Sequence, residues 1–413
     1  MSILKNEPIY PFKEDDYTKP RHIIVEGTNE EIGFALGTLA KNEYGTKLGI
    51  YDDAIYAEAR REYLTQNYPV MLERSQGVLR AFGLPADDVV HDGTKLPYDF
   101  YGDTRGAKDL GATLSFCSAV VLPHEQTDTG APYVSRNFDW LPLVLWSEVL
   151  GQKIPDGAFN SLARSFVLEI RPEQGYKTIL VGGHGLLHPV GDGLNEKGLY
   201  VTQLADPGAI TTLGMPLSGG PNSGLSVFQA MGMVLNTCVT VEEAKIAILR
   251  NHVAEVVVGL HLLIADVSGA VTGFEIDHDT QSYRFTDRRV NEPFLCTNHP
   301  VHLYPTPDTY PEIDMSREHN TFTRQVLLRD KFATLEAPYK REDATALTDV
   351  VHCAFADDKK AEAAPRERTL YNINADLSKP EISVRFYLGD VGPIAGTNHM
   401  EDRMSDFYTY SFF

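Results

Sequence analysis

One cysteine, one arginine and one aspartate stand at positions that could serve nucleophilic chemistry. Cys117 lies near the start of an apolar stretch, and Arg136 and Asp139 lie at the end of the next one. A cysteine attacks as its thiolate, and a free thiol has a pKa of about 8.5, so a neighbouring cation is needed to populate the thiolate near neutral pH. Cys117 is therefore a candidate nucleophile, with the arginine and the aspartate as its candidate partners.

The elements that must bring these residues together are the two arms of a predicted β-hairpin. Residues 115–123 and 133–140 are rich in aliphatic, β-branched and aromatic side chains, whereas the segment 124–132 between them is polar and contains glycine and proline. This pattern is typical of two antiparallel strands joined by a turn. Folding the second arm back onto the first would place the arginine and the aspartate near the cysteine.

The same residues also fit a purely structural interpretation. An isolated cysteine is more often a small buried apolar residue than a nucleophile. An Arg-x-x-Asp pair on a strand is commonly solvated and contributes little to stability. A single catalytic cysteine gains weight only from partners elsewhere in the sequence, so the hairpin alone leaves both interpretations open.

Several motifs in order resemble one enzyme family. Cys-Ser at a strand start, followed by Ser-Arg-Asn-Phe-Asp-Trp at 135–140, resembles the N-terminal-nucleophile amidases of the choloylglycine hydrolase and penicillin V acylase family. It resembles still more their relatives, the acyl-CoA:isopenicillin N acyltransferases, and the Asn-Glu-Lys-Gly-Leu turn at 195–199 matches a turn of the family. In that family the chain cuts itself before the cysteine. The new α-amino group, with an ordinary pKa of about 7.7–8.0, then serves as base.

The resemblance predicts self-cleavage between Phe116 and Cys117, because a cysteine in mid-chain has no α-amine of its own. The placement of the partner residues on the return arm predicts that Asp139 orients the α-amine and that Arg136 favours the thiolate. Relatives often carry a small residue before the cysteine, and the bulky Phe116 departs from that pattern.

The resemblance implies two further site residues. Asn298 follows a threonine at the place of the family's Thr-Asn pair, which makes it the candidate oxyanion-hole donor. Arg324, near the start of a late predicted helix, matches an arginine that approaches the nucleophile, and Arg368 is a competitor for that role. The hydrolases carry an asparagine shortly after the 195–199 turn, whereas residues 203–206 here read Gln-Leu-Ala-Asp, which leaves the substrate preference open.

The predicted fold is α+β, a four-layer αββα sandwich of the N-terminal-nucleophile hydrolase type with a helical N-terminal leader. Strand patterns recur through the middle of the chain and are interrupted by paired helices at about 225–236 and 240–249. We expect residues 1–116 (the leader) to form a pro-segment or small subunit that stays associated with a catalytic body at 117–413. A parallel sheet built of βαβ units is not expected.

Composition limits the partners and the compartment. The 413 residues carry a net charge of −20, from 57 acidic against 37 basic side chains. Nucleic acids and anionic membranes require basic surfaces, so neither is expected to bind. No stretch has the length of a membrane span, and no signal-peptide core follows the first methionine. We expect a cytoplasmic protein, in whose reducing surroundings the cysteine stays a thiol.

Cofactor chemistry finds little support. The four cysteines are widely spaced, with no Cys-x-x-Cys motif. The histidine pairs His184/His188 and His299/His302 could suggest a metal, but His-Glu-x-x-His is absent from the sequence. The Gly-rich turns do not follow the strand-to-helix pattern of a dinucleotide site. We expect neither a metal nor a cofactor.

The predicted activity is hydrolysis of a small-molecule N-acyl amide through an acyl-thioester on Cys117. An acyltransferase, in which an amine intercepts the same thioester, is the alternative, because the chemistry up to the acyl-enzyme is shared. A non-catalytic binding protein on the same fold is a second alternative. Homo-oligomerisation is left open.

Overall fold

The structure is a computed structural model. Phe116, His184 and His188 lie outside the residues that it describes, as does the rest of the segment 96–116. The described residues are 2–50, 54–95, 117–140, 161–183, 186–187, 190–206, 224–254, 259–277, 279–312, 320–354, 367–397 and 399–412.

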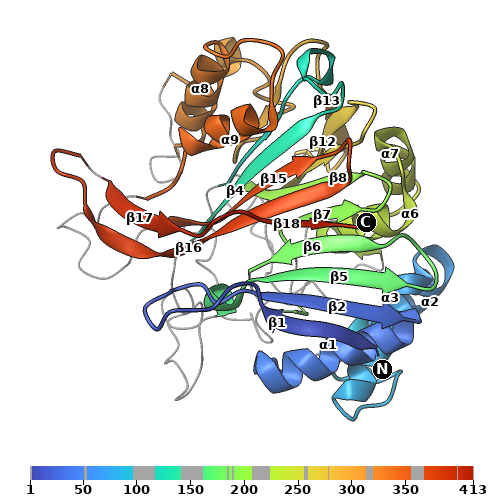
Figure 1. The fold of residues 1–413 in the computed structure, drawn as a ribbon. Coiled ribbons are helices and arrows are strands. Elements are labelled where there is room, and N and C mark those ends of the chain that lie inside the picture. Colours follow the sequence, from blue (N-terminus) through green and yellow to red (C-terminus); the bar gives the residue numbers. More distant parts are fainter. Residues whose placement is uncertain are drawn as a thin grey trace.

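The larger of the two main sheets has nine described strands (Figure 1). Neighbouring strands are antiparallel except β2 and β5, which are parallel. In spatial order the strands are β1 (Ile3–Pro8), β2 (Arg21–Gly27), β5 (Phe166–Pro172), β6 (Thr178–Gly182), β7 (Asp192–Asn195), β8 (Tyr200–Asp206), β11 (Gly259–Ala265), β12 (Val271–Ile276) and β13 (Tyr283–Asp287).

The second main sheet contains the predicted hairpin. Strand β3 pairs antiparallel with β4, with Cys117 opposite Phe138, so the hairpin is confirmed. The sheet runs in the order β14 (Phe294–Cys296), β3 (Cys117–Val121), β4 (Tyr133–Trp140), β15 (Arg368–Asp376), β16 (Glu381–Pro393) and β17 (Met400–Met404), and β18 (Tyr408–Ser411) also pairs with β16. A separate parallel pair joins β9 (Leu225–Ser226) and β10 (Val253–Ala254).

Helices cover the outer faces of both sheets, and the two inner faces meet through β3 and β8. This arrangement confirms the four-layer αββα sandwich. The nine-stranded sheet is covered by α1 (Asn29–Glu43), α3 (Pro69–Ala81), α6 (Val227–Thr237) and α7 (Val241–Leu249), with α2 (Ala54–Asn67) packed on α3; the other sheet is covered by α8 (Thr321–Phe332) and α9 (Arg341–Asp349). Short 3₁₀ turns occupy Gly93–Lys95, His124–Gln126, Ser161–Arg164 and Pro307–Thr309.

The leader is built into the sheet of the body. Its three helices agree with the sequence, and α1 begins with a capping box in which Thr28 and Glu31 satisfy each other's backbone N–H groups. Strand β1 forms within the first 20 residues. The polar composition of this segment gives no strand pattern, and the strand forms because it pairs with β2. Because β2 pairs in turn with β5, the leader continues the nine-stranded sheet.

Glycines allow α1 and α3 to cross at very short range. A Cβ on Gly77 would lie 2.0 Å from the carbonyl oxygen of Glu30, and a Cβ on Gly33 would lie 2.0 Å from that of Arg74. We expect Gly77→Ala to force the helices apart and to lower the free energy of unfolding by about 3 kcal/mol, measured by urea denaturation. Gly232→Ala on α6 is the control, because its Cβ would meet only the Tyr68 hydroxyl, at 3.2 Å. Equal stability of the two variants would contradict the prediction.

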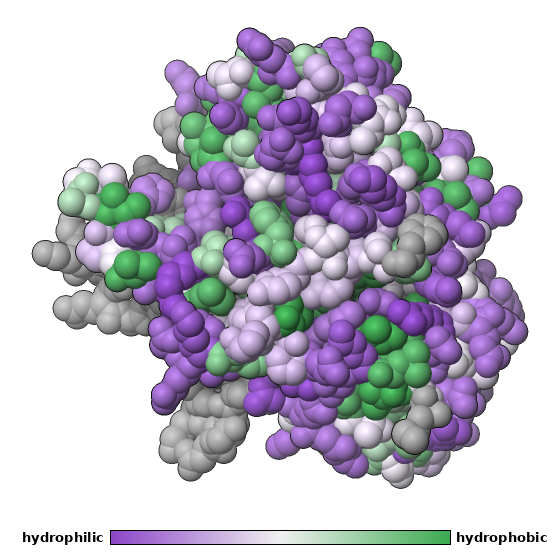
Figure 2. Space-filling model, in the orientation of Figure 1, coloured by the Kyte–Doolittle hydropathy of each residue, from purple (hydrophilic) through white to green (hydrophobic). Residues whose placement is uncertain are grey.

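The surface in Figure 2 is mostly hydrophilic, with scattered apolar side chains and a cluster of them at the lower right. Within the described ranges, no helix has both the length and the apolar character needed to cross a membrane.

Candidate active site

Cys117 is the first residue of β3 and is buried between the two sheets. Side chains alternate across a strand, so Cys117 shares its face with Ala119 and Val121 and packs into the large core between the sheets. Val120 and Leu122 belong instead to the cluster under α8 and α9. The thiol therefore faces the nine-stranded sheet.

Arg136 reaches the thiol. Its Nη2 lies 3.2 Å from Cys117 Sγ and donates at 3.1 Å to the backbone oxygen of Gln203 on β8. The side chain is fully buried, and its guanidinium carbon lies 4.7 Å from the centre of the Phe138 ring. Arg136 thus bridges the two sheets at the cysteine, as the hairpin predicts.

Asp192 on β7 is the counter-ion of this arginine and is absent from the sequence prediction. Its Oδ1 lies 3.7 Å from Arg136 Nε. Tyr200 and Tyr371 hydroxyls donate to Asp192 at 2.7 and 2.9 Å. Burial, the largest single influence, would lower the pKa of Arg136, but Asp192 together with Cys117, Tyr371 and Tyr200 outweighs it, so the pKa is raised and the cation persists. The only sequence signal was an aspartate beside a glycine in a predicted turn.

Asp139 lies on the opposite face of β4. Its Oδ1 accepts a hydrogen bond from Thr369 Oγ1 at 2.6 Å, and its Oδ2 is buried without a hydrogen-bond partner among the described residues. Burial raises the pKa of the Asp139 carboxyl, against the opposing effects of Thr369 and nearby cations. The structure therefore brings Arg136 to the thiol, while the Asp139 carboxylate lies on the other face of β4.

Asn298 contacts the backbone of Cys117. Its Oδ1 accepts from the Cys117 N–H at 2.8 Å, and its Nδ2 donates to the backbone oxygen of Ala205 at 2.6 Å. The amide oxygen, rather than the amide NH₂, thus faces Cys117. One of the two Nδ2 hydrogens is used by Ala205, so a second hydrogen is left for another acceptor.

Arg324, and not Arg368, lies beside Cys117. The Arg324 guanidinium donates to the Cys117 backbone oxygen and, at 2.7 Å, to Asn298 Oδ1. Arg368 instead forms a bidentate ion pair with Asp390, in which Nε and Nη2 donate to the two carboxylate oxygens at 2.8 and 2.9 Å. The sequence leaves these two arginines as competitors, and the geometry favours the first.

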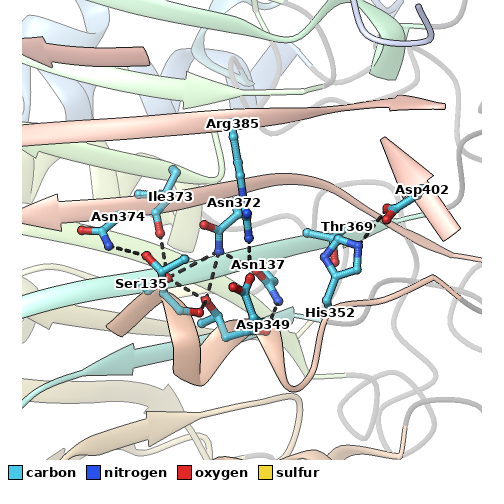
Figure 3. A network of polar contacts seen from close by, with 12 residues as sticks. Ser135, Asn137, Asp349, His352, Thr369, Asn372, Ile373, Asn374, Arg385 and Asp402 are labelled. Carbon is cyan, nitrogen blue, oxygen red and sulfur yellow. Dashed lines mark hydrogen bonds and ion pairs between the residues drawn. The ribbon is translucent and has the colours of Figure 1, made fainter. Parts of the chain in front are cut away.

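A buried polar network holds the back of the hairpin against α9 (Figure 3). Ser135 Oγ lies 2.7 Å from Thr348 Oγ1, and Asn137 Nδ2 donates to the Thr348 backbone oxygen at 2.8 Å. Asn372 Nδ2 donates to Asn137 Oδ1 at 2.6 Å. These bonds join β4 and β15 to the helix, while the buried Asn372 Oδ1 has no hydrogen-bond partner among the described residues.

Burial governs the ionisation of the thiol. It raises the pKa of Cys117, while the neighbouring Arg136 and Arg324 act to lower it and Asp139 acts to raise it. The two arginines do not outweigh burial, so the pKa of the Cys117 thiol lies above its usual value.

Glu275 on β12 anchors the loop that follows Asn298. Its two carboxylate oxygens accept from the backbone N–H groups of Val301 and His302, at 2.7 and 3.0 Å. His261 Nδ1 lies 2.5 Å from the same carboxylate. Burial alone would raise the pKa of Glu275, but His261 and His302 lower it well below its usual range.

We expect Glu275→Gln to destabilise the protein by about 3 kcal/mol at pH 7. A depressed carboxyl pKa stabilises the fold fully above the unfolded value of about 4.3, and that stability is lost as the pH falls toward the folded value. The difference from wild type, measured by urea denaturation, should therefore shrink below pH 4.3. The exposed Glu401→Gln is the control, and a difference that stays constant with pH would contradict this account.

Within the described part of the chain, no group of three or more His, Cys, Asp or Glu side chains could hold a metal ion. His299 lies beside Thr321 and the Phe322 ring, and His302 binds Glu275.

Two facing, mostly antiparallel sheets between helical layers, with a buried cysteine at the first residue of a strand, define an N-terminal-nucleophile hydrolase fold. The family described as acyl-coenzyme A:6-aminopenicillanic acid acyl-transferase matches residues 126–387, which is more than half of the chain. The chain belongs to this family. The matched range includes Arg136, Asp139, Asn298 and Arg324 and begins after Cys117.

Solved structures of two other proteins are similar to this chain. A mutant of a conjugated bile acid hydrolase from Clostridium perfringens is 14% identical with a TM-score of 0.44, and the match covers 72% of this chain and 97% of that one. A penicillin V acylase from Agrobacterium tumefaciens is 16% identical with a TM-score of 0.39, covering 72% of this chain and 86% of that one. No curated protein sequence matches the chain.

Proposed function

We propose that the protein is a cysteine amidase that hydrolyses a small-molecule N-acyl amide through an acyl-thioester on Cys117. The observation that carries the proposal is the 3.2 Å contact between Arg136 Nη2 and the Cys117 thiol in a buried site. Asn298 and Arg324 converge on the backbone of the same residue. A merely structural cysteine needs no buried cation beside it, because burying an arginine is costly.

Self-cleavage before Cys117 prepares the enzyme. The Cys117 sulfur attacks the carbonyl carbon of Phe116, and the acyl group moves from nitrogen to sulfur. Water then hydrolyses this thioester. The products are a chain that ends in the Phe116 carboxylate and a body that begins with the free α-amino group and thiol of Cys117.

The new α-amino group supplies the base that the buried thiol needs. It takes the thiol proton as the sulfur attacks the substrate carbonyl and returns a proton to the leaving amine. Asn298 Oδ1 already accepts from this nitrogen, which supports the amide oxygen as an anchor for the amine. The Asp139 Oδ2 is buried and has no hydrogen-bond partner in the described part of the chain, which supports that carboxylate as the counter-charge when the amine is protonated.

The tetrahedral intermediates need hydrogen-bond donors aimed at the developing oxyanion. The remaining Nδ2 hydrogen of Asn298 is the proposed donor. Arg324 holds Asn298 and the Cys117 backbone in fixed positions relative to each other. Arg136 stabilises the thiolate when the thiolate acts as the leaving group. Water then attacks the acyl-thioester, which releases the acid and restores the thiol.

The leader remains associated after cleavage in this proposal. Seven residue pairs join β2 to β5, from Arg21↔Phe166 to Gly27↔Pro172. The packing of α1 and α3 against the nine-stranded sheet buries a further apolar cluster that contains Ile32, Leu36 and Leu168. Separation of the fragments would expose both the sheet edge and this cluster to water.

Acyl transfer is the second candidate, favoured by the description of the family to which the chain belongs. The two activities share the acyl-enzyme and differ in the group that attacks it. Mass spectrometry of protein mixed with a panel of N-acyl amides should detect an acyl adduct on the peptide that contains Cys117. Adding amine acceptors should leave the acid as the main product. Dominant N-acyl product would establish transfer, and the absence of adduct and turnover, with slow labelling of Cys117 by iodoacetamide, would favour the binding protein.

A further inference from the structure

An apolar cavity lies between the leader and the body. Its volume is about 140 Å³. Helices α1 and α3 of the leader form one side, and β5, β6 and α6 of the body form the other. Its walls include Leu36, Met71, Val78, Leu168, Ile170 and Phe228.

This cavity and the candidate nucleophile lie on opposite faces of the nine-stranded sheet. On β5, Leu168 and Ile170 point toward the leader helices and belong to the leader cluster. Val167 and Ile179 point to the other face and share the inter-sheet core with Cys117. A molecule in the cavity would therefore not contact the thiol.

Arg74 on α3 gives this apolar cavity one charged wall. Its Nε donates to Asn29 Oδ1 at 3.1 Å. The residue as a whole is only partly buried, but its Nη2 is buried and has no hydrogen-bond partner among the described residues. Burial lowers the pKa of this guanidinium. A buried guanidinium nitrogen without a partner is costly for the fold, so its presence calls for an anionic partner.

We propose that the cavity binds a small monocarboxylate with an apolar tail. The carboxylate would accept hydrogen bonds from Arg74, whose planar guanidinium suits that group. The tail would fill the apolar part, because an apolar cavity of about 150 Å³ accommodates benzene. The walls come from both the leader and the body, so the bound acid would also stabilise their contact.

Isothermal titration of the full-length protein with benzoate and hexanoate tests the proposal. Both should bind, with equal affinity in wild type and Cys117→Ala, whereas acetate lacks the tail and benzyl alcohol lacks the charge, so both should bind at least tenfold more weakly. Arg74→Met should weaken benzoate binding at least tenfold through loss of a charged hydrogen bond. It should not lower the melting temperature of the free protein, because it removes an uncompensated charge.

Two further variants locate the site. Arg80→Met, on the same helix, removes an exposed ion pair with Glu30 and a contact with the Phe34 ring, and should leave benzoate affinity unchanged. Leu36→Phe should fill the cavity and abolish binding, and it decides the question if Arg74→Met fails to fold. The proposal is overturned if neither acid binds at millimolar concentration, or if Leu36→Phe and Arg74→Met bind benzoate like wild type. Protection of Cys117 from iodoacetamide by benzoate would place the acid in the catalytic site instead.

Discussion

Cys117→Ala should lower amide turnover by roughly 10⁴-fold or more, because loss of a covalent nucleophile removes the whole acyl-enzyme route. The variant should stay folded. Cys117 contributes one small buried side chain to the inter-sheet core, and α9 and its polar network hold the hairpin from the other side. The measurement is steady-state turnover of the amide that gives the adduct, together with the melting temperature.

Cys238→Ala is the matched control for this substitution. Cys238 is also buried but lies at the end of α6, where it contacts Thr237. Its loss should cost some stability and leave turnover within about twofold, because it removes core contacts alone. If Cys117→Ala retained wild-type turnover, the thiol would not be the nucleophile.

Arg324→Met should lower kcat by about 100-fold, similar to the loss of one donor that stabilises a transition state. The guanidinium joins the Cys117 backbone oxygen, Ser118 Oγ and Asn298 Oδ1. Without the guanidinium, Asn298 and β3 lose the group that links them. The effect should fall on kcat more than on KM, because the arginine acts on the reacting groups and not on the distant part of the substrate.

Arg368→Met is the control for this prediction. Arg368 is buried like Arg324, but its ion pair with Asp390 joins β15 to β16 away from the thiol. The variant should lose stability and keep a kcat within about threefold of wild type, since the pair is structural. The reverse ranking of the two variants would assign the site to Arg368.

The hairpin was predictable because its determinants are local. Two runs of aliphatic, β-branched and aromatic residues around a polar turn specify β3 and β4 within one short stretch. The geometry of a strand carries a further signal that the sequence prediction did not use. Arg136 and Asp139 are three residues apart, and side chains at an odd spacing on a strand point to opposite faces. Both residues could not face Cys117 from a regular strand, and the structure places only Arg136 at the thiol.

The remaining site residues depend on contacts between distant segments. Asp192 meets Arg136 only because two sheets pack face to face, and a short turn gives no sign of that pairing. Arg324 and Arg368 look alike in sequence and differ in which strand lies across from them. The apolar cavity depends on how closely α1 and α3 approach, which glycine backbone contacts determine. The sequence does not distinguish Arg74 from the other charged residues, because the burial of its Nη2 depends on the packing of the fold.

The central claim is that Cys117 becomes an N-terminal nucleophile, and intact-mass measurement of purified wild-type protein tests it most directly. Under denaturing conditions we expect two fragments that meet at Phe116/Cys117, and these should co-elute as one species under native conditions. The Cys117→Ala protein should give one intact chain. A wild-type chain that stays uncut and is fully active would contradict both the self-cleavage and the α-amine as base.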